Sequence, residues 1–190
     1  MAAERRQFDP RRDFEGVSRF LVGLCRPGNR DGNWLQPIWE YAYTHPWFDD
    51  AAVRHVGIWE DAGRIVAVAT YELKLGEPPE DADEGRRKMQ SGPNFRPELT
   101  IVAVAPNGEF VSYAGLGYES TDRYAYVEPV ATDPDYRRRG LASACVLEGI
   151  RRCGALGAEI AYVGTDKPLY LSLGFRPQFV TRRWRKRLVE

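Results

Sequence analysis

The sequence predicts an α/β fold, and three observations lead to this prediction. Two segments near the end of the chain, 123–132 and 157–165, are rich in the residues that favour β-strands, and a helix-like segment, 137–157, separates them. A strand, a helix and a second strand in succession indicate a parallel or mixed sheet. The 190 residues, 43% of them hydrophobic, suffice for one domain that buries roughly 70% of its unfolded surface. We therefore expect a single domain over residues 1–190.

The first third of the chain is predicted to be helical. One apolar face recurs at three- and four-residue intervals: Phe14, Val17, Leu21 and Leu24. This helix should end at Arg26-Pro27-Gly28, and Asn33 is a candidate N-cap for a second helix that ends before His45-Pro46. The inward face of the second helix is expected to hold Trp34, Leu35, Ile38, Trp39 and Ala42.

Two β-hairpins follow, separated by a charged segment. Their strands and turns are expected at 55–60, 61–63 and 64–73 in the first hairpin, and at 98–105, 106–108 and 109–119 in the second. Residues 77–97 combine Pro, Gly and charge with few apolar side chains, so we expect a long surface loop there. The last part of the chain should form a strand, a helix, a strand, a short helix and a final strand, at 123–132, 137–157, 157–165, 166–175 and 178–188.

Composition excludes several classes of protein. The 27 basic and 27 acidic residues give no net charge, which argues against a polyanion binder that relies on a basic excess. Mean hydropathy is −0.48, and no segment approaches the ~20 apolar residues that cross a bilayer. The opening MAAERRQFDPRR lacks the apolar run of a secretory signal, and three cysteines form no paired pattern. We expect a cytoplasmic protein without a metal site, a membrane partner or a nucleic-acid partner.

The segment 130–142 carries the chemistry. An expected strand runs into a turn, and the turn opens a helix with the pattern Arg137-x-x-Gly140-x-Ala142. A helix start leaves about four backbone N–H groups unpaired and carries partial positive charge. Small residues allow a ligand to approach this backbone, and neighbouring arginines add charge-assisted donors. The pattern predicts a phosphate or pyrophosphate site.

Other well-known sites are absent from the sequence. It contains no GxxxxGK[ST] and no GxGxxG, so neither the P-loop nor the dinucleotide-binding loop is present. HExxH and GxSxG do not occur either, which excludes the corresponding zinc and serine hydrolases. Cys145 and Cys153 lie in the long predicted helix, where small core residues are the simpler interpretation.

The order of these motifs resembles the GCN5-related N-acetyltransferase (GNAT) family. The matching pieces are EPVATDPDYRRRGLA, the long helix after it, the strand AYVGT, and Leu169-Tyr170-x-x-Leu173-Gly174-Phe175. The resemblance covers residues 98–190 and implies a mixed, mostly antiparallel central sheet with splayed parallel strands and flanking helices. It implies acetyl-CoA as co-substrate, with 98–190 as the acetyl-CoA-binding core and 1–97 as a degenerate N-terminal half that shapes the acceptor side.

The resemblance also implies roles for individual residues. The pantetheine arm of the coenzyme would pair with the strand at Val130, Ala131 and Thr132, where exposed backbone groups can bind its two amides. Pro129 cannot donate to a ladder, so we expect a break or bulge beside them. The pyrophosphate would lie on the helix start, whose residues are Arg137, Arg138, Arg139, Gly140, Leu141, Ala142 and Ser143.

Two residues are candidates for proton transfer. Tyr170 matches the tyrosine that lies near the coenzyme sulfur in the family, where it can protonate the departing thiolate. Glu128 precedes the cofactor strand and could accept the proton of an amine through water, but it could equally face solvent or pair with an arginine. Glu119 and Asp122 are weaker candidates for this base.

The resemblance implies an N-acetyltransferase that transfers acetyl to a primary amine by direct attack in a ternary complex. The acceptor would be a small-molecule or peptide amine; Trp34, Trp39, Trp47 and Trp59 could line its pocket, although core packing explains them equally well. A non-catalytic acyl-CoA sensor or scaffold is the alternative, because only Asp166, Lys167 and Pro168 separate the strand from the tyrosine motif. A nucleic-acid module is disfavoured by the neutral charge, despite its candidate residues Arg182, Arg183, Arg185, Lys186 and Arg187. The sequence leaves open whether the chain forms a homodimer.

Overall fold

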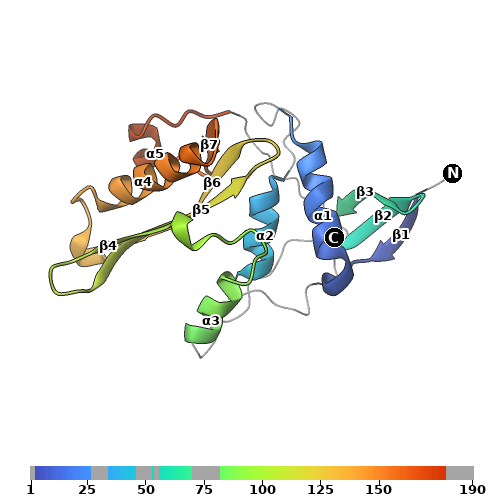
Figure 1. The fold of residues 1–190 in the computed structure, drawn as a ribbon, viewed down its shortest axis with the longest axis horizontal. Helices are drawn as coiled ribbons and strands as arrows, with labels where there is room; N and C mark the ends of the chain where they lie inside the picture. Colours follow the sequence, from blue (N-terminus) through green and yellow to red (C-terminus); the bar gives the residue numbers. More distant parts are fainter. Residues whose placement is uncertain (1–2, 27–33, 46–52, 54–55, 70–81, 179–190) are drawn as a thin grey trace, which may run out of the picture.

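The α/β fold class is confirmed in a computed structural model, which describes residues 3–26, 34–45, 53, 56–69 and 82–178 (Figure 1). In this part of the chain, seven strands form two sheets. The smaller sheet is antiparallel, in the order β1 (Glu4–Gln7), β2 (Gly57–Asp61) and β3 (Arg64–Ala69). The larger sheet has the order β4 (Thr100–Val104), β5 (Phe110–Glu119), β6 (Tyr124–Thr132) and β7 (Ile160–Tyr162).

Helices cover both faces of the larger sheet. Helix α4 (Leu141–Ala155) packs on one face and α2 (Gln36–Thr44) on the other, as Figure 1 shows. Helix α1 (Pro10–Leu24) packs against α2 and β3, which places it between the two sheets. Two shorter helices complete the described part: α3 (Ala82–Met89), which contacts α2, and α5 (Pro168–Ser172), which follows β7.

Strand β6 leaves its neighbour β7 partway along its length. The two strands pair in parallel only from Tyr124 to Tyr126, whereas β6 continues to Thr132 with β5 on its other side. Among the described residues, the β7-facing edge of β6 is therefore unpaired after Tyr126. The splayed parallel pair confirms the arrangement that the family resemblance implied.

A bulge interrupts the pairing of β5 with β6 at Pro129. Leu116 pairs with Val127 and Ala114 with Val130, so Gly115 alone lies opposite Glu128 and Pro129. A Cβ at Gly115 would lie 2.8 Å from the hydroxyl of Tyr113 and 3.1 Å from the carbonyl oxygen of Glu128. The expected bulge is thus confirmed, and it leaves little space for a side chain on the opposite strand.

Two main hydrophobic cores hold these layers. One lies between α4 and the larger sheet and includes the fully buried Leu99, Val127, Val146 and Cys153. The other lies around α1 and is built on Val17, Trp39 and Ile58, with Phe14 stacked on Trp39 at a centroid distance of 5.8 Å. A small third cluster, Leu35, Tyr124 and Tyr126, packs α2 against β6.

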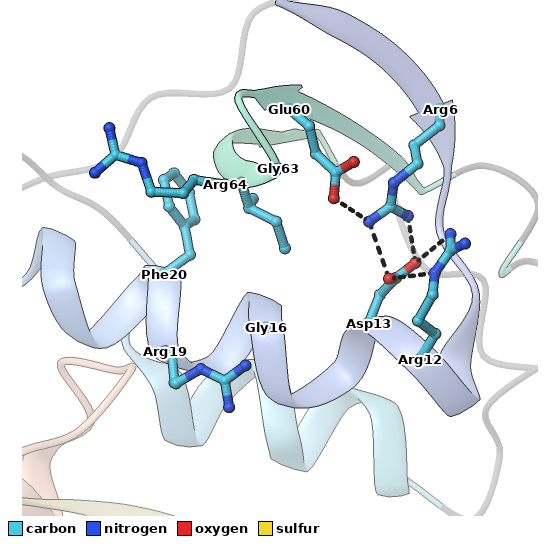
Figure 2. A pocket seen from close by; sticks show the side chains of 10 residues that line it. Arg6, Arg12, Asp13, Gly16, Arg19, Phe20, Glu60, Gly63 and Arg64 are labelled. Atoms are coloured by element: carbon cyan, nitrogen blue, oxygen red, sulfur yellow. Dashed lines mark hydrogen bonds and ion pairs between the residues drawn. The ribbon is translucent and has the colours of Figure 1, made fainter.

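An ion-pair network fixes α1 to the smaller sheet at a cavity of about 630 Å³ (Figure 2). Asp13 is only 3% exposed, and its carboxylate accepts hydrogen bonds from Arg6, from Arg12 and from the backbone N–H of Asp9. Arg6 also pairs with Glu60 of β2. The pKa of Asp13 lies well below its usual range because these donors stabilise the charged form against the cost of burial.

The prediction of a surface loop at 77–97 is wrong for its middle part, because Ala82–Met89 form helix α3. The helix has Asp83 and Glu84 in its first turn and Arg86, Arg87 and Lys88 in its last turn, an order that complements the helix dipole. Arg86 pairs with Asp83 at 3.0 Å one turn apart. The order of charges stabilises this helix in place of an apolar face. A search for apolar periodicity therefore does not detect the helix.

The helix expected at 137–157 begins four residues later, at Leu141. Arg138 and Gly140 have φ values of 63° and 78°, which a right-handed helix does not allow. The second helix begins at Gln36 with Leu35 as its N-cap, and Trp34 is 41% exposed rather than inward. Asn33 and residues 179–188 of the predicted final strand lie outside the described residues.

Candidate active site

The turn before α4 presents an arc of free backbone donors. The first hydrogen bond of the helix runs from the N–H of Ala144 to the carbonyl of Gly140, at 3.0 Å. In the described part of the chain, no group accepts from the six N–H groups of Arg138 through Ser143. A Cβ at Gly140 would meet no atom within 4 Å, so the space over this backbone is open. Six donors at the positive end of a helix form an anion-binding surface.

Two arginines hold this turn in place. Arg137 donates from Nε to the carbonyl of Thr132 at 3.2 Å, and Arg139 donates to the carbonyl of Asp135 at 3.0 Å. The guanidinium of Arg139 also lies over the ring of Tyr136, 4.9 Å from its centroid. Arg138 is exposed, with no hydrogen bond or ion pair to the rest of the described chain. The chain's own hydrogen bonds therefore hold the arc in its shape.

The adjoining edge of β6 offers further backbone groups. The N–H of Asp133 donates to Val111 of the β5 side, and the carbonyl of Ala131 accepts from Ser112 of β5 at 3.2 Å. Backbone groups alternate along an antiparallel strand, so those of Val130 and Thr132 point to the free edge, and Ala131 points to β5. The carbonyl of Thr132 is the group that Arg137 contacts.

Glu128 lies at the bulge, on the face of the sheet that α2 covers. Its side chain follows Tyr124 and Tyr126 in the alternation of β6 and is half-buried. Burial raises the pKa of its carboxyl, and the nearby positive charge of Lys167 partly opposes this rise. A carboxyl with a raised pKa in a partly dry site is a suitable proton acceptor.

Tyr170 is buried in α5, only 6% exposed, with its ring edge-on to Phe175 at 5.8 Å. Burial raises the pKa of its hydroxyl, and the carboxylate of Glu128 raises it further. The hydroxyl therefore keeps its proton at neutral pH. A cavity of about 980 Å³ opens beside it and is lined by Tyr126, Tyr170 and residues 163–166, but not by Glu128.

The other sequence candidates do not join this site. Glu119 lies at the opposite end of the β5–β6 hairpin, where it accepts from the N–H groups of Thr121 and Asp122. Cys145 and Cys153 are buried core residues, and burial raises the pKa of Cys153 to about 11. The described residues contain no cluster of side chains able to hold a metal ion.

Three tyrosines near Glu128 were missed by the sequence analysis: Tyr41, Tyr113 and Tyr126. Burial and the charge of Glu128 raise the pKa values of Tyr41 and Tyr126 to about 12. The sequence did hold a signal for Tyr126: side chains alternate along a strand, so residues 126 and 128 of β6 lie on the same face of the sheet. Of the tryptophans considered for the acceptor pocket, Trp39 is 2% exposed in the α1 core, whereas Trp47 lies outside the described residues.

Similarity to solved structures extends over different shares of the chain. A GNAT family N-acetyltransferase from Escherichia coli, solved in complex with CoA, is 26% identical over 40% of this chain and 44% of its own, with a TM-score of 0.36. An acetyltransferase structure from Pyrococcus furiosus is 15% identical over 45% and 63% of the two chains, with a TM-score of 0.38. This chain thus spans less than two thirds of either protein.

A third structure matches along nearly the whole chain. An aminoglycoside acetyltransferase from an uncultured soil metagenomic sample is 16% identical over 98% of this chain and 100% of its own, with a TM-score of 0.42. No curated protein matches the sequence.

The family comparison covers more than half of the chain. The acetyltransferase (GNAT) family matches residues 69–175, which begins before the segment 98–190 that carried the resemblance and ends at Phe175. In the part of the chain that the structure describes, no helix is long and apolar enough to cross a membrane. The chain belongs to the acetyltransferase (GNAT) family.

Proposed function

We propose that the protein is an N-acetyltransferase that transfers acetyl from acetyl-CoA to a primary amine by direct attack in a ternary complex. The observation that carries this proposal is the juxtaposition of an open arc of N–H groups, 138–143, with the free edge of β6 and with Glu128 and Tyr170. We further propose that residues 98–190 bind the co-substrate, that residues 1–97 shape the acceptor side, and that the protein acts in the cytoplasm.

Two groups of residues would hold acetyl-CoA. The N–H groups of Arg138 through Ser143 suit the pyrophosphate, because they are free and lie at a helix N-terminus. The outward backbone groups of Val130 and the N–H of Thr132 suit the pantetheine amides, which would add to β6 like a further strand. Arg137 would position the turn through its hydrogen bond to Thr132.

Glu128 and Tyr170 would move the two protons of the reaction. An alkyl ammonium of pKa about 10.4 is less than ~0.1% neutral at pH 7, so Glu128 takes its proton through a water molecule. The free amine then forms the new N–C bond, and the C–S bond breaks as the nitrogen releases its second proton to solvent. Tyr170 donates its proton to the departing thiolate, and the acid and base are later restored by exchange with solvent.

The test of the co-substrate site is the rise in Tm that acetyl-CoA produces. At a concentration about 100 times Kd, binding adds about 2.7 kcal/mol of stability, which corresponds to roughly 5–10 °C in a protein of this size. Replacing Gly140 by Val should abolish this rise for two reasons. The valine side chain fills the space over the arc, and valine disfavours the positive φ of 78° that residue 140 has. A wild-type protein whose Tm does not rise would overturn the proposal.

Gly108→Val is the matched control. Gly108 also has a positive φ, 88°, with no atom within 4 Å of a Cβ, but it lies in the turn between β4 and β5. Both variants should lower Tm through backbone strain, yet only Gly108→Val should keep the response to acetyl-CoA. Release of free thiol with a panel of primary amines then separates a transferase from an acyl-CoA sensor, which would show the Tm rise without turnover.

A further inference from the structure

The cavity of about 630 Å³ between α1 and the smaller sheet has no part in the site described above (Figure 2). Its walls come from α1 and from β1, β2 and β3, whereas the N–H arc precedes α4 beside the larger sheet. Figure 1 shows α1 and α2 between the smaller sheet and α4. Among the described residues, the charged lining of this cavity consists of four arginines and two carboxylates: Arg6, Arg12, Arg19, Arg64, Asp13 and Glu60.

The charges in one part of this cavity neutralise one another. The buried carboxylate of Asp13 accepts hydrogen bonds from Arg6 and Arg12, and Arg6 also pairs with Glu60. Hydrogen bonds from Arg6 hold the pKa values of both carboxyls below their usual range, so both are ionised at neutral pH. Two carboxylates therefore balance two arginines, and this network carries no net charge.

Arg19 and Arg64 add two positive charges that are not balanced within the described part of the chain. Neither side chain forms a hydrogen bond or an ion pair with the described residues. Glu15 lies one helical turn before Arg19 but does not pair with it or line the cavity. Asp61 lies opposite Arg64 in the β2–β3 ladder, and the same is true of it. The cavity thus has an excess of positive charge.

The floor of the cavity is formed by backbone and apolar side chains. Arg12 and Arg19 lie on one face of α1, two turns apart, and Gly16 between them has no side chain. A Cβ at Gly16 would lie 3.1 Å from Cδ1 of Ile65, so α1 and β3 approach each other closely there. Ile65 and Phe20 are half-buried and supply apolar surface. Figure 2 shows Phe20, Arg19 and Arg64 on the side of the cavity opposite the ion-pair network.

This combination fits a small organic anion. A guanidinium group presents its N–H donors in a planar fork that matches the oxygens of a carboxylate or a phosphate. Small-molecule sites commonly have volumes of about 300–1,000 Å³ and combine apolar walls with a few polar groups. We propose that this cavity is a second ligand site, which binds a small organic dianion with phosphate or carboxylate groups through Arg19 and Arg64. The carbon skeleton of the dianion lies on Phe20 and Ile65.

The experiment compares three compounds that share a benzene ring: phenyl phosphate, phthalate and dimethyl phthalate. At neutral pH the first two are mainly dianions, and the third is uncharged. Isothermal titration of the wild-type protein at low ionic strength should show at least about tenfold tighter binding of one or both dianions than of the ester. The tighter dianion identifies the anionic group that the site prefers. No preference for either dianion over the ester, including no binding at all, would overturn the proposal.

Arginine variants assign the binding to this cavity. Arg19→Gln and Arg64→Gln should each weaken the binding of the preferred dianion about tenfold, and the double variant should remove the preference over the ester. Arg11→Gln is the matched control, because it removes the same charge from an exposed position of α1 that does not line the cavity. An equal loss in Arg11→Gln and Arg19→Gln would show a general effect of charge and would contradict the site.

A final variant separates this site from the N–H arc, which is also suited to anions. Gly140→Val, which fills the space over the arc, should leave the affinity for the dianion unchanged. Loss of binding in Gly140→Val, with binding retained in the double arginine variant, would place the dianion on the arc and overturn the second site. The rise in Tm with acetyl-CoA tests the proposed transferase independently, since Arg19 and Arg64 belong to neither the acetyl-CoA site nor the proton-transfer pair.

Discussion

At the scale of single residues, the environment of Glu128 matters most. The carboxyl lies at a bulge, half-buried, among tyrosines that cannot supply positive charge, and Lys167 is the cation that acts on it. Its raised pKa brings protonation closer to the working pH, which is the usual requirement of a general base. Its neighbour Tyr170 keeps its proton for the same physical reason, burial.

The pH dependence of acetyl transfer should report this carboxyl. Below its raised pKa, Glu128 is protonated and cannot accept a proton, so kcat/KM should fall as the pH decreases through a value above the ordinary 4.5 of a glutamate. Glu128→Gln should lower kcat/KM by about 100-fold and move the acid limb to higher pH, toward the pKa of the amine itself, about 10.4. Glu159→Gln, which alters an exposed carboxylate paired with Arg123, should leave the profile unchanged. An acid limb that stays at its wild-type pH in Glu128→Gln would assign the base to another residue.

At the scale of elements, two glycines of α4 have different surroundings, and only one of them touches the larger sheet. A Cβ at Gly149 would overlap the side chain of Leu116 in β5, so the helix approaches the sheet closely at this point. Gly154, near the end of the same helix, has no atom within 4 Å of a Cβ. The close approach of α4 to β5 therefore depends on Gly149 and not on Gly154.

Alanine at these two positions should have opposite effects on stability. Gly149→Ala overpacks the interface and should cost about 1–3 kcal/mol of unfolding free energy. Gly154→Ala adds no clash and should stabilise the helix by up to ~1 kcal/mol. Urea unfolding measures both variants, and two changes of the same sign would contradict the packing described for α4.

At the scale of the whole molecule, two cores are built on separate sheets. The larger one carries the N–H arc and β6, and the other holds α1 against β1–β3. Helix α2 joins them, because Trp39 belongs to the α1 core whereas Leu35 packs on β6. The buried Asp13 adds an electrostatic connection between α1 and the smaller sheet through Arg6.

Asp13 should contribute stability that depends on pH. Its folded pKa is depressed, so the contribution is present above the unfolded pKa of about 3.9 and is lost as the pH falls from there toward the folded pKa. Asp13→Asn should lower the unfolding free energy at pH 7 by about 3 kcal/mol, because Arg6 and Arg12 lose a buried partner. It should also flatten the loss of stability below about pH 5.

The control for this prediction is Asp83→Asn on α3. Asp83 is 66% exposed in its pair with Arg86, and an exposed pair of this kind contributes ~0.5 kcal/mol or less. Chemical unfolding at a series of pH values compares the two variants. A loss at Asp13 no larger than the loss at Asp83 would show that the network does not hold α1 to the sheet.

Much of the fold could be predicted because its signals are local. The apolar spacing of Phe14, Val17 and Leu21 identified α1, and the turn glycines Gly63 and Gly108 identified both hairpins. Helix α3 was missed because charge order stabilises it in place of an apolar face. The late start of α4 was missed because Arg138 has a left-handed φ, which cannot be predicted for an arginine from the sequence.

The sequence by itself determined the strand, the turn with Gly140 and the helix that follows, and hence the candidate phosphate site. Those features depend on contacts within about ten residues, where spacing and residue type are sufficient. Only the tertiary structure decided which face Glu128 takes and that Tyr41 and Tyr113 lie near it. These residues are far apart in the chain, and their meeting depends on how α2 packs over β5 and β6. Such packing arises from burial summed over many side chains, which no local pattern specifies.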